Sequence, residues 1–235
     1  MIKLSDRLQK IADFIEPGES VADIGTDHGF LPAALWERGK SPRIILSDIN
    51  PGPLKKTTAN LDRFFPGKEF DIRIGSGIRT LKPAEVDVVV IAGMGGLLIA
   101  EILGDDPEKA RSFKKLILQP RNAQNKLRAW LLENGFAIRD EALVRERKYL
   151  CEIILAAPGG PVLKKNPDDI DLEISPILFE KKDPLLVEFI ENKIRIESRV
   201  YMEIEAGATR NKDEKLKRSK ERMEALHELQ RRSEY

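Results

Sequence analysis

The chain has 235 residues, of which 41% are hydrophobic and 34% are charged, and its formal net charge is +1. This length is enough for one full-sized domain with a smaller additional unit. The balanced charge predicts no general attraction to nucleic acid, although it is compatible with a local basic surface. No apolar run approaches the ~20 residues that a membrane span requires. Charges interrupt the first residues before an apolar segment develops, so we expect no signal peptide and no membrane association.

The use of cysteine and histidine indicates a cytoplasmic protein without a metal centre. The single cysteine, Cys151, lies in a strand-like apolar segment, where we expect it to act as a small buried hydrophobe. One cysteine cannot form a disulfide within the chain, which fits a reducing compartment. Because His28 and His227 are the only histidines, the sequence predicts no metal site of the zinc type.

Strand and helix patterns alternate through the first two thirds of the chain. A helix is predicted first, because Leu4, Leu8 and Ile11 recur at helical spacing after Ser5, a suitable N-cap. Predicted strands then occupy residues 21–24, 43–48, 70–74, 87–92, 116–118, 136–144 and 149–156. Helices separate the first five strands, whereas the last two follow each other directly and predict an antiparallel hairpin at one edge. The expected fold is α/β, with a seven-stranded, doubly wound, Rossmann-like sheet.

A change of composition marks a second unit. Residues 158–161 read Pro-Gly-Gly-Pro, which is typical of a linker. Beyond them, apolar residues follow helical spacing over 185–204 and again over 216–229, with a turn near Gly207 and Asn211. Two long helices with a short turn predict an antiparallel helical hairpin or coiled coil. We therefore expect one domain over residues 1–157 and a helical domain over residues 158–235.

One stretch of the helical domain is locally basic. It carries seven basic residues against three acidic ones: Arg210, Lys212, Lys215, Lys217, Arg218, Lys220 and Arg222. The simplest interpretation is a solvated helix face. The functional interpretation is contact with the phosphates of a nucleic acid.

The first predicted strand ends in a glycine-punctuated loop that is typical of cofactor sites in α/β sheets. Asp23 belongs to the strand, and Gly25, Asp27 and Gly29 follow it before the next helix. A dinucleotide fingerprint, Gly-x-Gly-x-x-Gly, would place its second glycine where Asp27 stands. An aspartate there would repel a pyrophosphate but suits a cationic ligand. The loop therefore favours S-adenosylmethionine (SAM) over NAD, with an ordinary strand-to-loop turn as the alternative.

Four more loops follow predicted parallel strands, at the edge where ligands of open α/β sheets bind. Asp48 ends the second strand, where an acidic residue can accept hydrogen bonds from ribose hydroxyls. Residues 75–78, which include Ser76 and Gly77, are placed to border an adenine ring. Residues 92–96 read Ala-Gly-Met-Gly-Gly, and so many glycines suggest that a ligand approaches the backbone. Residues 119–122 place amides and a guanidinium at the same edge.

Other chemistries find no support in the sequence. The chain has no Gly-x-x-x-x-Gly-Lys-Ser/Thr loop for nucleoside triphosphates and no Gly-x-Ser-x-Gly nucleophile elbow. His28 has two interpretations, either as a residue that caps backbone groups or as one that contacts the cofactor or the target base.

Four segments in this order resemble the bacterial TrmK family of tRNA (adenine-N1)-methyltransferases: residues 4–8, 22–32, 91–96 and 118–122. The resemblance covers residues 2–157, and the helical tail matches in kind, since family members carry a C-terminal coiled coil. It implies methylation of the adenine at tRNA position 22 and a SAM pocket formed by Arg7, Asp23, Gly25, Asp27, His28, Gly29, Asp48, Ala92, Gly93 and Met94. The chain departs from the family after strand three, where Gly-Asp-Gly is replaced by Gly75-Ser76-Gly77. Ser76 and Gly77 are therefore expected to border the adenine without a carboxylate.

Methylation of a ring nitrogen depends mainly on positioning. We expect Gly93, Met94, Gln119 and Asn122 to line the base pocket, and Asp27 to stabilise the positive charge on the methylated base. Arg121 and the basic stretch of the tail are expected to contact tRNA, with the protein acting as a monomer. Alternatives are a methyltransferase of another substrate, a non-catalytic SAM-fold scaffold that recruits a partner through its tail and, more distantly, a dehydrogenase.

Overall fold

A computed structural model describes residues 2–26, 28–207 and 211–233. The chain forms two compact units, Met1–Pro167 and Asp168–Tyr235. The predicted linker, which begins at residue 158, thus lies in the last part of the first unit. Among the described helices, none has the length and apolar character of a membrane span.

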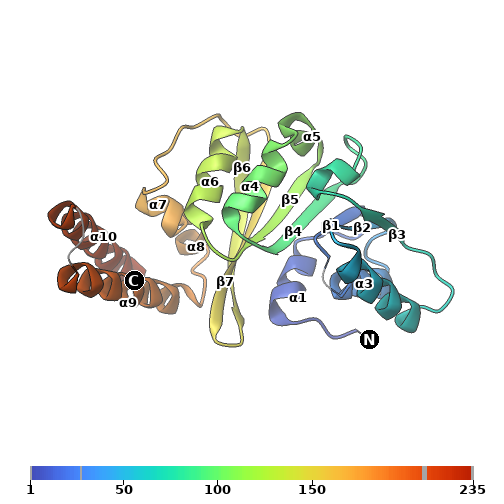
Figure 1. Cartoon of the computed structure of the whole chain (residues 1–235), viewed down its shortest axis with the longest axis horizontal. Helices are drawn as coiled ribbons and strands as arrows, with labels where there is room; N and C mark the ends of the chain where they lie inside the picture. Colours follow the sequence, from blue (N-terminus) through green and yellow to red (C-terminus); the bar gives the residue numbers. More distant parts are fainter. Residues whose placement is uncertain (1, 27, 208–210, 234–235) are drawn as a thin grey trace. The chain divides into compact units, whose positions relative to one another are not determined.

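The first unit contains one seven-stranded sheet (Figure 1). Its strands are β1 (Val21–Ile24), β2 (Ile44–Asp48), β3 (Asp71–Ile74), β4 (Val88–Met94), β5 (Lys115–Pro120), β6 (Phe136–Glu146) and β7 (Tyr149–Pro158). The spatial order is β3-β2-β1-β4-β5-β7-β6. Strands β1 to β5 pair in parallel, and β7 is antiparallel to both β5 and β6. The predicted doubly wound sheet with a hairpin at one edge is confirmed.

Helices cover both faces of this sheet. They are α1 (Asp6–Asp13), α2 (Phe30–Glu37), α3 (Pro51–Phe64), the 3-10 turn η1 (Gly77–Thr80), α4 (Gly96–Gly104), α5 (Pro107–Ser112) and α6 (Gln124–Glu133). Val89 and Ile91 of β4 pack with residues of α4, α5 and α6. Val88 and Val90 pack with residues of α1, α2 and α3 on the opposite face. Burial on both faces explains why β4 is a continuous β-branched run.

Local signals fix most of the element boundaries. Ser5 caps α1, and its hydroxyl accepts a hydrogen bond from the Leu8 N–H at 3.5 Å. Gly39 adopts a φ of +59° just after α2, as expected for a residue that follows a helix C-cap.

Several strands extend further than predicted. Strand β4 continues to Met94, so Gly93 and Met94 are strand residues and not part of the following loop. Strand β5 continues to Pro120, so Gln119 is a buried strand residue and not part of the following loop.

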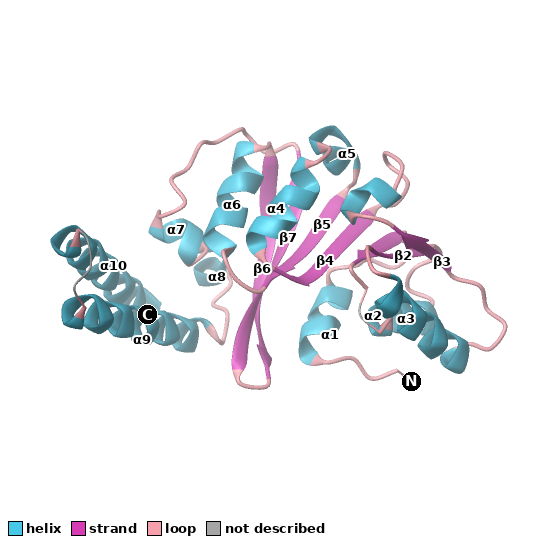
Figure 2. Cartoon of the chain, in the orientation of Figure 1, coloured by secondary structure: helices cyan, strands magenta, loops and turns pink. Residues whose placement is uncertain are grey.

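The second unit is helical, and Figure 2 shows its helices in cyan. It contains α7 (Ile170–Glu173), α8 (Pro176–Glu180), α9 (Leu186–Ala206) and α10 (Lys212–Ser233). The two long helices are those predicted from the apolar spacing, and they contact each other. Helices α7 and α8 are too short to show a helical period in the sequence.

Candidate functional site

The carboxyl ends of adjacent parallel strands place the predicted loops together at one sheet edge. The Ser47 carbonyl of β2 accepts hydrogen bonds from the N–H groups of Gly25, at 2.7 Å, and Thr26, at 3.1 Å. The Asp48 carbonyl accepts another from the Gly75 N–H at 3.0 Å. These bonds attach the loops after β1 and β3 to the end of β2, as the positions of the strands in the sequence predict.

The loop after β1 depends on left-handed backbone conformations. Gly25, His28 and Gly29 have φ values of +74°, +60° and +68°. A Cβ atom at Gly25 would lie 2.1 Å from Met94 Cε, so a larger residue would displace this side chain. The His28 carbonyl accepts a hydrogen bond from the Asn60 amide at 3.0 Å, which anchors the loop to α3. The predicted site residue Asp27 lies outside the described residues.

The end of β2 presents a carboxylate beside exposed apolar surface. Asp48 is half-buried, and its Oδ1 accepts a hydrogen bond from the Asn50 N–H at 2.7 Å. The next residue, Ile49, is 62% exposed, so its aliphatic side chain is accessible to a ligand. Ile49 is not among the residues that the sequence predicts for the site. An apolar residue directly after an acidic strand end was the signal that could have identified it.

Ser76 and Gly77, the two predicted site residues after β3, have different surroundings. Ser76 is exposed and precedes η1. Gly77 has a φ of +51°, and a Cβ atom there would lie 2.6 Å from Ile102 Cγ2. Close packing against α4 therefore explains Gly77, whereas Ser76 is accessible to a ligand.

Gln119 connects three elements at this edge. Its Oε1 accepts hydrogen bonds from the Gly93 N–H of β4 at 3.0 Å and from Arg7 Nη1 of α1 at 3.3 Å. Its Nε2 donates to the Pro120 carbonyl at 3.1 Å. Because Gln119 is only 3% exposed, this network fixes the positions of Arg7 and of the end of β4.

The glycines of the Ala-Gly-Met-Gly-Gly segment serve two different purposes. A Cβ atom at Gly96 would lie 2.5 Å from the Ala123 carbonyl oxygen, and the Gly96 N–H donates to the Asn122 carbonyl at 2.9 Å. The segment that approaches Gly96 is thus the chain's own loop after β5. Gly93, in contrast, has a φ of +77° and no described residue within 4 Å of its Cβ position. Gly93 is the glycine that leaves space for a ligand.

These residues fit an adenosyl ligand that carries positive charge. The half-buried carboxylate of Asp48 suits a ribose, and the exposed aliphatic side chain of Ile49 suits a base. The space at Gly93 suits the methyl donor. Thr26 Oγ1, in the loop after β1, and Ser47 Oγ, on β2, are buried without a hydrogen-bond partner among the described residues. Within residues 2–26, 28–207 and 211–233, no group of three or more His, Cys, Asp or Glu side chains is arranged to hold a metal ion.

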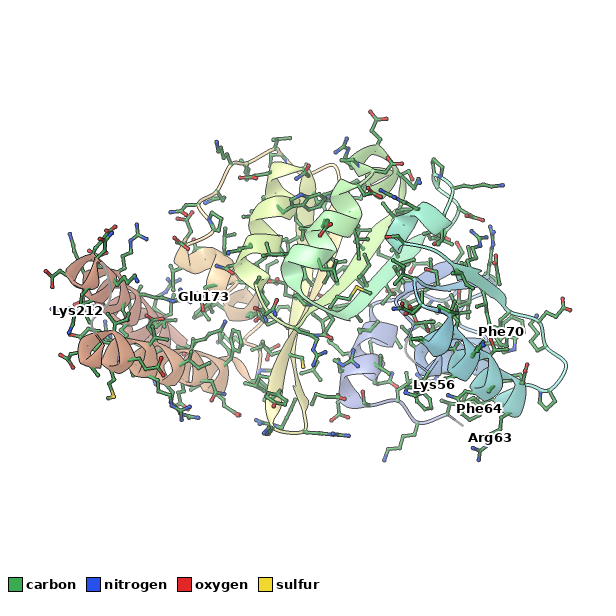
Figure 3. All side chains as sticks on the ribbon, in the orientation of Figure 1. Lys56, Arg63, Phe64, Phe70, Glu173 and Lys212 are labelled. Carbon is green, nitrogen blue, oxygen red and sulfur yellow. The ribbon has the colours of Figure 1, made fainter. Side chains whose placement is uncertain are left out.

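The predicted basic stretch lies mainly on α10, and Arg210 falls outside the described residues. Figure 3 labels Lys212 at the start of this helix, where its ammonium donates to the Glu205 carbonyl. Two further cations form i,i+4 pairs: Arg218 with Glu214 and Lys217 with Glu221. Lys215 and Lys220 are exposed. These pairs reduce the net positive charge that α10 presents.

Arg222 belongs to an ionic cluster within the helical unit. It pairs with Glu173 of α7, labelled in Figure 3, and with Glu197 of α9 at 3.3 Å. Lys193 lies 3.1 Å from the same Glu173 carboxylate. Burial raises the pKa of Glu173, but Lys193 and Arg222 together hold it below its usual value. The structure therefore gives Arg222 a role in joining three helices.

Known proteins resemble this chain over most of its length. Residues 4–154 match the model of a family described as a methyltransferase domain. The chain is 31% identical over 233 residues to the tRNA (adenine(22)-N(1))-methyltransferase of Bacillus subtilis, and the match covers 97% of each protein. The crystal structure of the B. subtilis m1A22 tRNA methyltransferase TrmK superposes with a TM-score of 0.85, at 30% identity, over 98% of this chain and 100% of that one. A Streptococcus pneumoniae structure in complex with S-adenosyl-L-methionine has a TM-score of 0.79 and 29% identity, over 94% of this chain and 100% of that one.

Proposed function

This chain belongs to the family of tRNA (adenine(22)-N(1))-methyltransferases, and from that premise we propose that it transfers a methyl group from SAM to N1 of adenine 22 in tRNA. The main support for the proposal is the arrangement at the sheet edge. There the loop at Gly25, the Asp48 carboxylate and the space beside Gly93 come together. A non-catalytic scaffold would have no need of this set. A methyltransferase of another substrate is the alternative, and the relatives favour tRNA.

We assign the cofactor to the loop after β1 and to the carboxyl ends of β2 and β4. The left-handed loop at Gly25, His28 and Gly29 would hold the amino-acid part of SAM, next to the N-terminus of α2. Asp48 would accept hydrogen bonds from the ribose hydroxyls, and the exposed Ile49 would contact the adenine ring. Asp23, Arg7, Ser76, Gly77 and Ala92 stay predictions for the rim of this pocket.

The target base would lie over the ends of β4 and β5. SAM supplies a methyl group on a positively charged sulfur. The N1 lone pair forms the new N–C bond as the methyl–sulfur bond breaks, which leaves a neutral thioether and a positive charge on the base. Gly93, Met94 and Asn122 would hold the base in line, with Gln119 fixing the backbone beneath it. No general base is required, because N1 carries no proton.

Asp27 is proposed to stabilise the positive charge on the methylated base. We expect Asp27→Asn to lower turnover at saturating SAM, since the uncharged amide would stabilise that charge less. Unchanged turnover would contradict this role.

The helical unit is proposed to bind the tRNA backbone. N1 lies on the Watson–Crick edge, so the target base must leave its stack before it can react. A second contact with the folded RNA would hold the substrate during this step. Lys215 and Lys220 are the strongest candidates, because both are exposed and neither pairs with a carboxylate among the described residues. Lys217 and Arg218 are further contacts on α10, and Arg121 is a contact in the sheet unit. We propose a monomer that acts in the cytoplasm, where its substrate lies.

The decisive experiment uses purified protein, labelled SAM and unmodified tRNA transcripts, with identification of the modified nucleoside by mass. We expect 1-methyladenosine, and we expect its loss when adenine 22 is changed to guanine. Binding of SAM without methyl incorporation into any tRNA would contradict the proposed function.

A further inference from the structure

The β6–β7 hairpin extends beyond the rest of the sheet at the proposed active edge. Leu118 of β5 lies opposite Ile154 of β7, and β5 ends two residues later, at Pro120. Glu146 of β6 still pairs with Tyr149 of β7, at the turn of the hairpin. This turn therefore projects past the carboxyl end of β5, as Figure 2 shows.

The turn is anchored to the site residues. The Glu146 carboxylate accepts a hydrogen bond from the Arg7 N–H at 3.4 Å, and Arg7 also donates to Gln119. Burial raises the pKa of Cys151 on β7, while the charges of Arg7 and Arg121 act to lower it. Both arginines thus lie within electrostatic range of the hairpin. These contacts place the turn beside the loop that is proposed to hold the target base.

The turn presents two cationic side chains and one aromatic ring. Arg147 and Lys148 are exposed, and Arg147 has a φ of +56°. Tyr149 is 63% exposed, and Lys148 Nζ lies 5.3 Å from the centre of its ring. Because most of the Tyr149 side chain is exposed, packing within the unit does not explain the presence of this large ring. Cations beside an accessible aromatic ring are typical of surfaces that hold single-stranded nucleic acid, where phosphates meet the cations and a base stacks on the ring.

We propose that the β6–β7 turn binds tRNA nucleotides next to the target adenine, with Arg147 and Lys148 on phosphates and Tyr149 stacking on an unpaired base. This inference rests on the proposed function and adds the hairpin to Arg121 as a site of RNA contact within the methyltransferase unit. Stacking of a neighbouring base would stabilise the opened RNA conformation that exposes N1. The turn would thereby act in positioning the substrate.

The test uses the full chain and unmodified tRNA. Arg147→Glu/Lys148→Glu should raise the KM for tRNA at least about tenfold, and should lower the slope of log Kd against log salt by about 1 to 2. Tyr149→Ala should raise the KM for tRNA about tenfold, while Tyr149→Phe, which keeps the ring, should restore it. The Kd for SAM should stay within about twofold of the wild-type value in all variants, because none of them changes Glu146, which accepts the hydrogen bond from the Arg7 N–H.

The matched control is Lys56→Glu/Arg63→Glu on α3, labelled in Figure 3, which makes the same change in charge. Helix α3 packs against β2 and β3, at the other end of the sheet order from β7. An equal rise in KM for the control would overturn the proposal, as would unchanged kinetics in the hairpin variants. Failure of the wild-type protein to methylate tRNA would instead contradict the proposed function, so the two results are distinguishable. Arg147→Gly, which suits the positive φ, checks that loss of the cation and not misfolding causes the effect.

Discussion

The two compact units are stabilised by different forces. In the sheet unit, two apolar clusters fill both faces of the sheet, and central residues such as Val89 and Val90 are fully buried. The helical unit buries far fewer large apolar side chains: Leu172, Ile174, Leu178, Leu186, Phe189, Ile190, Leu226 and Leu229. It adds the partly exposed ionic cluster around Glu173. Apolar burial is not weakened by added salt, whereas partly exposed ion pairs are screened. We therefore expect the helical unit to be the more sensitive to salt.

The largest expected change in stability comes from a buried group of ion pairs in the sheet unit, which otherwise depends on apolar packing. Arg128 on α6 is fully buried and pairs with Glu141 at 2.8 Å and Glu152 at 2.6 Å. Arg128→Met would leave two carboxylates buried without their cation and should lower the free energy of unfolding by about 3–5 kcal/mol. Chemical denaturation measures this loss of stability, and the loss should not change with salt concentration.

Adding Glu141→Gln and Glu152→Gln to Arg128→Met removes the two unpaired charges, so we expect part of the stability to return. If no stability returned, the loss would be due to packing and not to charge.

The second effect tests the close approach of the loops after β4 and β5. Gly96→Ala should lower the free energy of unfolding by about 2–3 kcal/mol and abolish most methyl transfer, because its Cβ meets backbone oxygens that cannot move alone. Gly104→Ala on the same helix is the control. Its Cβ would make only ordinary contact with the Trp130 ring, at 3.5 Å. Equal losses in both variants would contradict the assignment.

The third effect concerns the helical unit. Glu173→Gln removes the charge that Lys193 and Arg222 share and should lower the free energy of unfolding by about 1–2 kcal/mol at low salt. The difference from wild type should shrink at high salt, in contrast to Arg128→Met. A loss that does not change with salt would remove the distinction between the two units.

The smallest effect is a pH dependence in the sheet unit. Hydrogen bonds from Arg73 hold the pKa of Glu85 at about 2, against burial that raises it. Because the folded-state value lies below the unfolded one, this stabilisation is present above the unfolded pKa and is lost as pH falls towards 2. Glu85→Gln should therefore destabilise the protein by about 1 kcal/mol at pH 7 and by less at pH 3. Equal destabilisation at both pH values would contradict this cause.

The sequence predicted the elements whose signals are local or repeated. The β-branched run of β4, Ser5 at the start of α1 and Gly39 after α2 each act through their own neighbours, so the pattern identifies them. It could not separate Gly93 from Gly96, because the difference depends on the loop after β5, which lies far along the chain. It also could not show that Arg222 pairs with Glu173, a contact between helices. Non-local packing thus decides which residues of a motif are structural.

We propose a division of labour between the two units, in which the sheet unit binds SAM and the helical unit provides most of the contact with tRNA. The most direct measurement compares the Kd values for SAM and tRNA of the full chain with those of residues 1–167, after thermal unfolding has confirmed that the shorter chain is folded. We predict a Kd for SAM within about twofold of the full-chain value and a Kd for tRNA at least about tenfold weaker, since one of two linked contacts is lost. Equal tRNA affinity in the two chains would contradict this account.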